Sequence, residues 1–167
     1  MKINPKYIYG YAWSLLETVT PCKTDCGKRC GAICCADSDS GTGMYLYPGE
    51  MAMYKNPSTW ETIEPSGFFY DGGEAQILSC KGICKREERP LACRIFPLVP
   101  YKKPNTRMKI IFDPRATAMC PLTPSDLTPS FIEAVTRSMR AVVKLKEARL
   151  FIEAQSELID AYVKFKL

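Results

Sequence analysis

CKTDCGKRCGAICC, residues 22–35, contains five of the nine cysteines of this 167-residue chain. Sulfurs so close together in sequence form disulfides, bind a metal, or lie buried as inert thiols. The first residues lack the apolar run and the cleavage motif of a secretory signal peptide. No stretch approaches the roughly 18 apolar residues of a membrane helix. We therefore expect a cytoplasmic protein, whose thiols are kept reduced, and this favours a metal site over disulfides.

The spacing of these cysteines limits how they can share an ion. A helix rises about 1.5 Å per residue, so Cys22 and Cys34 would lie about 18 Å apart on one straight helix. Four thiolates that bind one zinc at about 2.3 Å lie within roughly 4 Å of each other. One regular helix therefore cannot gather the repeat, although Gly27 and Gly31 allow the backbone to turn. Cys34 and Cys35 are adjacent, so they suit two ions or two corners of a cluster better than one small site.

The chain contains no histidine. Ser-His-Asp and Cys-His catalysis are thereby excluded, and a soft-metal site must consist mainly of thiolates. The remaining cysteines are Cys80, Cys84, Cys93 and Cys120. Lysines and arginines surround Cys84 and Cys93, and such cations stabilise the thiolate, which is the form that binds metal.

The segments CGKRCGAICC, CKREERPLACRIFPL and DPRATAMCPL together resemble the CxxCxxCC zinc- or iron-chelating domain family, the YkgJ-type cysteine-cluster proteins. The family pattern is a cysteine run ending in Cys-Cys, a further cysteine, a C-x8-C pair that encloses Arg-Pro and precedes Arg-x-Phe, and a final cysteine. The match spans residues 26–121 and implies these metal ligands: Cys26, Cys30, Cys34, Cys35, Cys80, Cys84, Cys93 and Cys120. The run here is spaced by three residues instead of two, the aromatic that often precedes Arg-Pro is missing, and Cys22 is extra, which makes it an additional candidate ligand.

The resemblance implies a metal-binding protein that holds zinc or an iron–sulfur cluster such as 4Fe–4S. The sequence does not choose between these metals, because both accept all-thiolate sites. The flagellin lysine N-methylase, a much longer protein, resembles this domain and is thought to use an iron–sulfur cluster and S-adenosylmethionine. Methyl transfer does not carry over, because this chain has no glycine-rich nucleotide loop after a clear strand. One alternative is an iron–sulfur enzyme or electron carrier, and a second is an accessory or assembly protein that docks a partner.

The order of elements predicts an α+β fold in which residues 1–127 form a cysteine-cluster domain and residues 128–167 a helical segment packed on it. A short helix is expected at the start, capped by Asn4 and ended by Pro21. Its buried face would consist of Tyr7, Tyr11, Leu15 and Leu16. The C-terminal segment has the apolar spacing of one long helix, or of two joined near Glu147.

The middle of the chain, residues 22–127, is rich in glycine, proline and loop signals. Short strands are expected at 44–47, 68–70 and 108–112, and a brief helix at Pro48. About a hundred residues with so little regular structure fold only if something crosslinks them. We therefore expect a small, irregular, metal-centred domain that is largely unfolded without its metal.

Nine lysines or arginines and two glutamates give residues 81–109 a charge of +7, against +5 for the whole chain. This basic stretch and the C-terminal helix are the candidate surfaces for a protein partner. Nucleic acid is not an expected partner, because no recognition motif accompanies the charge, and membrane binding is not expected either. Solvated surface charge explains Glu87 and Asp113 better than a catalytic carboxylate pair does. Candidate partners of the thiolates are Arg89, Arg94, Asp113 and Arg115.

Overall fold

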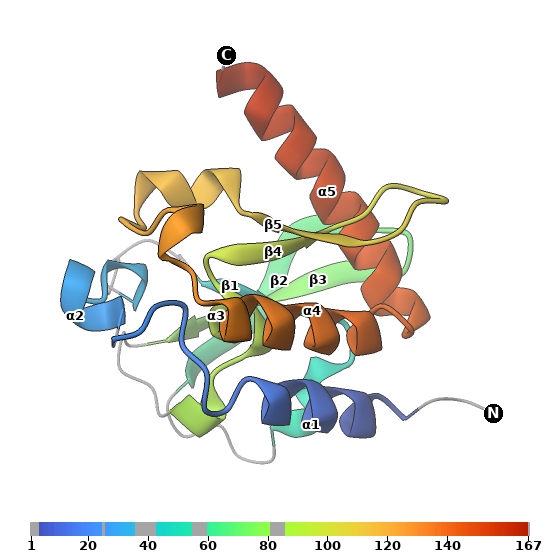
Figure 1. Cartoon of the computed structure of the whole chain (residues 1–167). Helices are drawn as coiled ribbons and strands as arrows, with labels where there is room; N and C mark the ends of the chain where they lie inside the picture. Colours follow the sequence, from blue (N-terminus) through green and yellow to red (C-terminus); the bar gives the residue numbers. More distant parts are fainter. Residues whose placement is uncertain (1–3, 25, 36–42, 55–59, 81–85, 167) are drawn as a thin grey trace.

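The structure is a computed structural model that describes residues 4–24, 26–35, 43–54, 60–80 and 86–166. It has the expected α+β architecture, in which helices pack against two small antiparallel sheets (Figure 1). The helices are α1 (Pro5–Leu15), α2 (Cys26–Cys30), α3 (Leu91–Ile95), α4 (Pro129–Val142) and α5 (Lys146–Lys166). Short 3-10 turns are η1 (Ile33–Cys35), η2 (Glu50–Met53), η3 (Arg86–Glu88), η4 (Pro114–Ala118) and η5 (Pro124–Asp126). The strands are β1 (Met44–Leu46), β2 (Trp60–Tyr70), β3 (Gly73–Cys80), β4 (Leu98–Tyr101) and β5 (Lys109–Phe112).

Helix α1 begins where the sequence predicts, but it ends at Leu15 and not at Pro21, and part of its expected buried face is exposed. The Asn4 side chain accepts a 3.0 Å hydrogen bond from the backbone N–H of Lys6, and a proline occupies the first turn. The buried side chains are Tyr9, Ala12, Trp13 and Leu16. Tyr7 and Tyr11, which we expected on the buried face, are 79% and 47% exposed. The expectation was right for Leu16 and wrong for the two tyrosines, because this helix has two apolar stripes and the stripe with Trp13 offers the larger apolar area.

The middle region contains a long β-hairpin that the sequence analysis missed in part. Strands β2 and β3 pair antiparallel, and β1 pairs with the other edge of β3, so the strand order is β1-β3-β2. The Asp71-Gly72 turn connects β2 to β3, and Asp-Gly suits a two-residue hairpin loop. Pro65 and Gly67 lie inside β2, where the pairing shifts register. These two residues interrupt the alternation of apolar residues, so only the end of β2 was predicted, together with β1 and β5.

Strands β4 and β5 form a separate two-stranded sheet, in which Leu98 pairs with Phe112. The C-terminal segment then forms two helices, the second of the two arrangements that the sequence allowed. The Thr128 side chain caps α4 by accepting a 3.3 Å hydrogen bond from the Phe131 N–H. The helices separate at residues 143–145, just before the predicted position.

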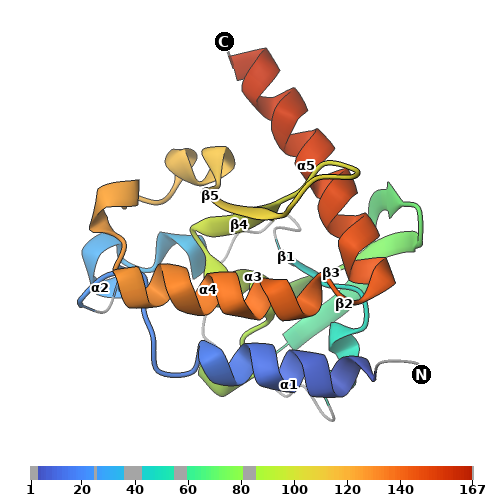
Figure 2. The same cartoon turned by 45° about the vertical axis from the view of Figure 1, so that its right-hand side comes forward.

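Helix α4 lies alongside α1, and α5 packs over strands of both sheets (Figure 2). The Ser138 hydroxyl of α4 donates a 2.9 Å hydrogen bond to the Ala12 carbonyl of α1. The Lys102 N–H, at the end of β4, donates to the Ser156 hydroxyl of α5 at 2.9 Å. These two polar contacts help to fix the positions of α4 and α5.

The centre of the core is aromatic. Phe151 of α5 is fully buried, with other rings 5.4 to 5.9 Å from it between centroids. These rings belong to Tyr45, Tyr47, Phe68 and Tyr70. Among the described cysteines, Cys22 belongs to the core cluster, and Cys26 and Cys120 pack against it. Apolar packing therefore contributes more to the middle region than the sequence suggested.

Within the described residues, no helix is long and apolar enough to cross a membrane. The C-terminal half of α5 extends beyond the rest of the molecule (Figure 1). Leu158, Val163 and Phe165 on this half are 42%, 40% and 87% exposed. The end of α5 is therefore an exposed, partly apolar helix surface.

Candidate metal centre

Helix α2 forms the middle part of the cysteine-rich stretch (residues 22–35), with Cys26 and Cys30 as its end residues. The backbone then turns through two residues of positive φ, Gly31 at 62° and Ala32 at 55°. The Ala32 N–H closes the helix end with a 2.8 Å hydrogen bond to the carbonyl five residues earlier. Gly31 thus interrupts the four-residue repeat, as the sequence analysis expected. The next turn, η1, contains Cys34 and Cys35.

Two contacts hold this stretch against the segment that precedes α4. The Thr128 N–H donates to the Pro21 carbonyl at 2.9 Å, and Arg29 pairs with Asp126 at 3.2 Å. Arg29 and Asp126 are 97 residues apart in the sequence. Figures 1 and 2 show α2 beside the η4–η5 segment as a result. Cys120, which lies between η4 and η5, is thereby brought to the cysteine-rich stretch.

The thiol of Cys120 is influenced by charges from the cysteine-rich stretch. Burial raises the pKa of the Cys120 thiol, and the charges of Cys30 and Cys22 raise it further, so all three lie within electrostatic reach. A hydrogen bond from the Leu122 backbone and the charge of Arg29 lower the pKa of the same thiol. The pKa of Arg29 is raised chiefly by its hydrogen bond with Asp126 and further by Cys22. The charge of Arg29 therefore acts near both Cys22 and Cys120.

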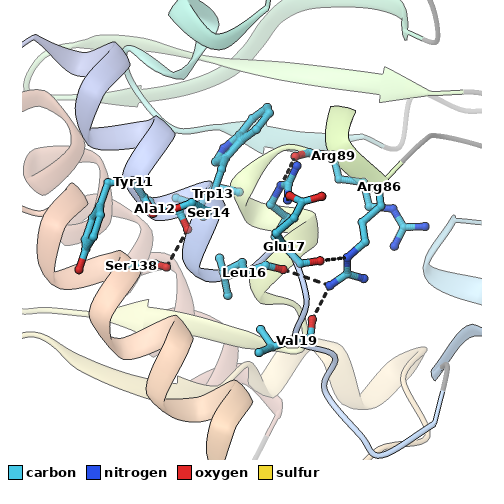
Figure 3. A network of polar contacts seen from close by, with 12 residues as sticks. Tyr11, Ala12, Trp13, Ser14, Leu16, Glu17, Val19, Arg86, Arg89 and Ser138 are labelled. Carbon is cyan, nitrogen blue, oxygen red and sulfur yellow. Dashed lines mark hydrogen bonds and ion pairs between the residues drawn. The ribbon is translucent and has the colours of Figure 1, made fainter.

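Cys26 lies within electrostatic reach of a second cation, Arg86. The guanidinium of Arg86 donates to the backbone carbonyls of Leu16 (3.1 Å), Glu17 (2.7 Å) and Val19 (Figure 3). Burial lowers the pKa of Arg86, and so do Arg89 and Arg94, whereas Glu17 and Cys26 raise it. Arg86 therefore satisfies carbonyls that the end of α1 leaves unpaired, while its charge acts on a thiol of α2.

Arg94, expected as a thiolate partner, makes its described contacts with α1 and with its own loop. Its Nε donates to the Arg89 carbonyl at 2.7 Å, and its Nη1 pairs with Glu17 at 2.9 Å. Its guanidinium carbon lies 4.4 Å from the centroid of the Trp13 ring. These contacts explain why a cation is tolerated with a side chain that is only 2% exposed.

Asp113 and Arg115, also expected beside the thiolates, pair with each other. The Arg115 Nη2 and Nε donate to the two Asp113 carboxylate oxygens at 2.7 and 2.9 Å. Asp113 also caps η4 by accepting from the Arg115 backbone N–H. This pairing gives the Asp113 carboxylate a structural role and does not favour a catalytic pair with Glu87. The expectation of a solvated surface charge was wrong for Asp113, which is 8% exposed, because Arg115 compensates its charge in the folded protein.

The other predicted ligands lie on further elements. Cys34 is exposed in η1, and Cys93 is half-buried in α3. Cys35 and Cys80 are the last residues of η1 and β3. Cys84 lies outside the described residues, as do two lysines of the basic stretch.

The donor set suits zinc or iron chemically, because thiolates are soft ligands and arginines offset their charge. In the described ranges, no three Cys, Asp or Glu side chains are arranged so that they could hold one metal ion. The six described thiols are those of Cys22, Cys26, Cys30, Cys34, Cys93 and Cys120. Cys22, Cys30 and Cys120 would hold an ion only after a local approach of their sulfurs. The ion would then crosslink two segments that lie far apart in the sequence.

Much of the described part of the basic stretch is engaged with other parts of the protein. Lys102 pairs with Glu153 of α5, and Lys103 pairs with Asp160 of α5 at 2.9 Å. Together with the contacts of Arg86 and Arg94, these ion pairs join much of the positive charge of the basic stretch to acidic side chains or backbone carbonyls of the same chain. The sequence carries no signal for them, because the acidic partners of the lysines lie on the C-terminal helix.

Arg29 was not expected as a site residue, although in the sequence it lies between the candidate ligands Cys26 and Cys30. Its position in Cys26-Gly-Lys-Arg-Cys30 was a usable signal, because a cation so close to cysteines stabilises thiolates. Asp126, which orients Arg29, had no such signal and is identified only by the tertiary contact.

The structure also contains a hollow that lies away from the described cysteines. It has a volume of about 520 Å³ and is lined by residues that include Tyr47, Tyr70, Glu74, Leu145 and Glu147. None of the described cysteines lines it. This hollow therefore gives no argument for a substrate pocket beside the thiols.

Comparisons with protein-family models, with curated proteins and with solved structures find no match. The resemblance to the CxxCxxCC family therefore remains a prediction that rests on the cysteine pattern and its neighbouring residues.

Proposed function

We propose that this protein binds zinc or an iron–sulfur cluster through cysteine thiolates and acts in the cytoplasm. The observation that carries the proposal is the 3.2 Å pair of Arg29 with Asp126, through which the cysteine-rich stretch lies beside the segment that carries Cys120 (Figure 1). Burial raises the pKa of the Cys120 thiol, and the Leu122 backbone hydrogen bond and the charge of Arg29 offset part of this effect. A bound metal ion would stabilise the thiolate further, because the thiolate is the ligand form of cysteine.

The proposed role of the metal is to fix one end of the molecule. Helix α2 has no buried residue, so apolar burial contributes little to holding it in place. Its described attachment includes the exposed pair of Arg29 and Asp126, and such pairs contribute little to stability. An ion shared between α2 and Cys120 would provide the missing stabilisation.

The first test is elemental analysis of protein purified without oxygen. One or two zincs per chain support a structural thiolate site, and about four irons support a 4Fe–4S cluster. With iron, a reversible redox couple would favour the enzyme or electron-carrier alternative. The matched control is the double variant Cys30→Ser/Cys120→Ser, which should retain less metal per chain. Wild-type protein with reduced thiols and no bound zinc or iron would overturn the proposal.

A second candidate is an accessory or assembly protein that docks a partner through α5. The exposed side chains of Leu158, Val163 and Phe165 on the protruding half of this helix favour it. A photo-crosslinking residue placed at position 165 would test it in cells. A single cross-linked product that the variant Val163→Asp no longer forms supports docking, and the absence of any product would count against it.

A further inference from the structure

The hollow of about 520 Å³ lies between the first residue of α1, strands β2 and β3, and the start of α5. The loop between β1 and η2 completes its lining. The start of α5 and the N-terminal end of α1 lie at the opposite end of the molecule from α2 (Figures 1 and 2). The hollow is therefore separate from the candidate metal centre, and the proposed function gives it no role.

Part of the lining is apolar and fixed in place by the core. Three of its side chains are buried: Leu46, Ala75 and Leu145. The Tyr9 hydroxyl of α1 donates a 2.8 Å hydrogen bond to the carbonyl of Pro48, another lining residue, and thereby holds α1 to this side of the hollow. A preformed apolar surface of this kind suits the methylene groups of an aliphatic ligand.

The two charged residues that line the hollow are both acidic, Glu74 of β3 and Glu147 of α5. No described lysine or arginine lines it, although the whole chain has a net charge of +5. Glu74 accepts a 2.7 Å hydrogen bond from the Gly67 N–H, and Glu147 lies in the first turn of α5, where the helix dipole favours a carboxylate. These neighbours leave the negative charges without a described cationic partner, so the hollow favours a cation.

A buried hydroxyl adds a third polar group. Tyr47 lines the hollow and is only 3% exposed. Its described hydrogen bond runs from its backbone N–H to Glu50 at 3.1 Å, and within the described residues its hydroxyl has no partner. Buried hydroxyls are ordinarily hydrogen-bonded, and a phenol oxygen can accept a hydrogen bond from an ammonium N–H. An amine in the hollow would therefore provide the donor that the protein does not.

An aromatic ring lies close to one of the two carboxylates. Tyr70 lines the hollow together with Glu147. Burial raises the pKa of Tyr70, and the charge of Glu147 raises it further, in agreement with this closeness. An ammonium group paired with Glu147 would thus also lie near an aromatic ring, which attracts cations.

We propose that this hollow binds a short aliphatic diamine, with its two ammonium groups paired with Glu74 and Glu147. One ammonium group donates an N–H to the Tyr47 hydroxyl, and the methylene chain lies on the apolar lining. The two positive charges of the ligand match the two carboxylates. Binding forms no covalent bond and is independent of the proposed metal site.

The test is a titration of the full-length protein with 1,4-diaminobutane, followed through the backbone amide signals in NMR. We expect saturable shifts at lining residues such as Ala75 and Leu145, with a dissociation constant of about 1 mM or lower. The absence of saturable shifts would overturn the proposal, and so would shifts confined to the cysteine-rich stretch.

Three variants locate the binding. Glu147→Gln should weaken it by about ten-fold or more, because a charge-assisted hydrogen bond is lost. Tyr47→Phe should weaken it by about five-fold, because only the hydroxyl is removed. Glu133→Gln, at an exposed position of α4 outside the hollow, is the control and should bind as wild type does. Equal affinity of all three variants would overturn the site, and Glu147→Gln decides the matter if Tyr47→Phe does not fold.

Two further ligands test the chemical class. The fully methylated diamine carries the same two charges without an N–H donor, so we expect it to bind at least about ten-fold more weakly. Magnesium ions carry two charges without a methylene chain and should also bind more weakly. Equal affinity for the methylated compound would overturn the assignment of a primary amine. Equal affinity for magnesium would show that the hollow is only an acidic surface, which would overturn the proposal.

Discussion

The indole N–H of Trp13 donates a 3.0 Å hydrogen bond to Oε1 of Glu50, a carboxylate with no exposed surface. The backbone N–H groups of Leu91 and Tyr47 donate to the same carboxylate at 2.6 and 3.1 Å. Glu50 thereby joins α1 to the loop before η2 and to the start of α3. A buried polar group of this kind stabilises the fold only while all its partners remain in place.

Replacing Glu50 with alanine removes the acceptor and leaves these buried donors without it. We expect the free energy of unfolding to fall by about 3 kcal/mol or more, because each unsatisfied buried donor costs about 1–3 kcal/mol. Urea unfolding followed by tryptophan fluorescence measures the change. Glu133→Ala, at an exposed position of α4, should stay within about 0.5 kcal/mol of wild type. Equal effects of the two substitutions would contradict the anchoring role.

Ionisation of the buried Glu50 should lower stability as the pH rises from 4.5 to about 7. Burial raises the pKa of Glu50 from 4.5 to about 7, although its hydrogen bonds and the charge of Arg94 lower it. Between these pH values Glu50 holds a proton in the folded protein that it has lost in the unfolded chain, so its contribution to stability is fully present below pH 4.5 and is lost as the pH rises to about 7. Urea unfolding at intervals across this range measures the decline. In Glu50→Gln, which cannot ionise, the decline should be absent, and a decline of the same size would assign it to other groups.

Arg86→Lys keeps the charge beside Cys26 but loses the planar fork that reaches the carbonyls of Leu16, Glu17 and Val19. We expect a loss of about 1–3 kcal/mol in the free energy of unfolding, since an ammonium does not replace these bonds. Hydrogen exchange should be faster at the end of α1. The control is Arg107→Lys, at an exposed position of the same basic stretch. Unchanged exchange at the end of α1 would show that Arg86 does not cap it.

Phe151→Ala should remove the centre of the aromatic core. Truncation of a fully buried phenylalanine costs about 3–5 kcal/mol, and the surrounding rings of β1, β2 and their connections lose their common partner. Thermal and urea unfolding measure the loss. Phe165→Ala on the same helix is the matched control, because Phe165 is 87% exposed. If both variants unfold at the same urea concentration, α5 does not pack on the sheets as described.

Metal removal should loosen one end of the protein and leave the core folded. The sequence analysis predicted a largely unfolded metal-free chain, but the apolar cluster of α1, α4, α5 and the sheets contains only Cys22 among the described cysteines. We expect a chelator to accelerate amide exchange in residues 22–35 while α4 and α5 stay protected. Hydrogen exchange with mass spectrometry distinguishes the two expectations, because loss of protection throughout α4 and α5 would support the earlier one.

Several parts of the fold could be read from local sequence. The cap at Asn4, the cap at Thr128 and the helix stop at Gly31 depend on the residue itself and its near neighbours. Strand β2 could not be read in the same way, because Pro65 and Gly67 mask its alternation and only pairing with β3 makes it a strand. The buried face of α1 could not be fully predicted either, because two stripes of that helix are apolar. The hydrogen bond that selects the stripe with Trp13 comes from Glu50, which lies 37 residues away in the sequence.

The same distinction between local sequence and tertiary contacts applies to the candidate site. By itself, the sequence determined the chemistry that is available: many thiols, no histidine, and arginines beside the cysteines. It also determined that one regular helix cannot gather the cysteine repeat, because the rise of a helix is a local property. Only the tertiary structure decided that the cysteine-rich stretch lies beside the segment with Cys120, and that much of the basic stretch is paired with α1 and α5. Such contacts join residues up to about a hundred positions apart, and they form only when the core has set the positions of the segments that carry them.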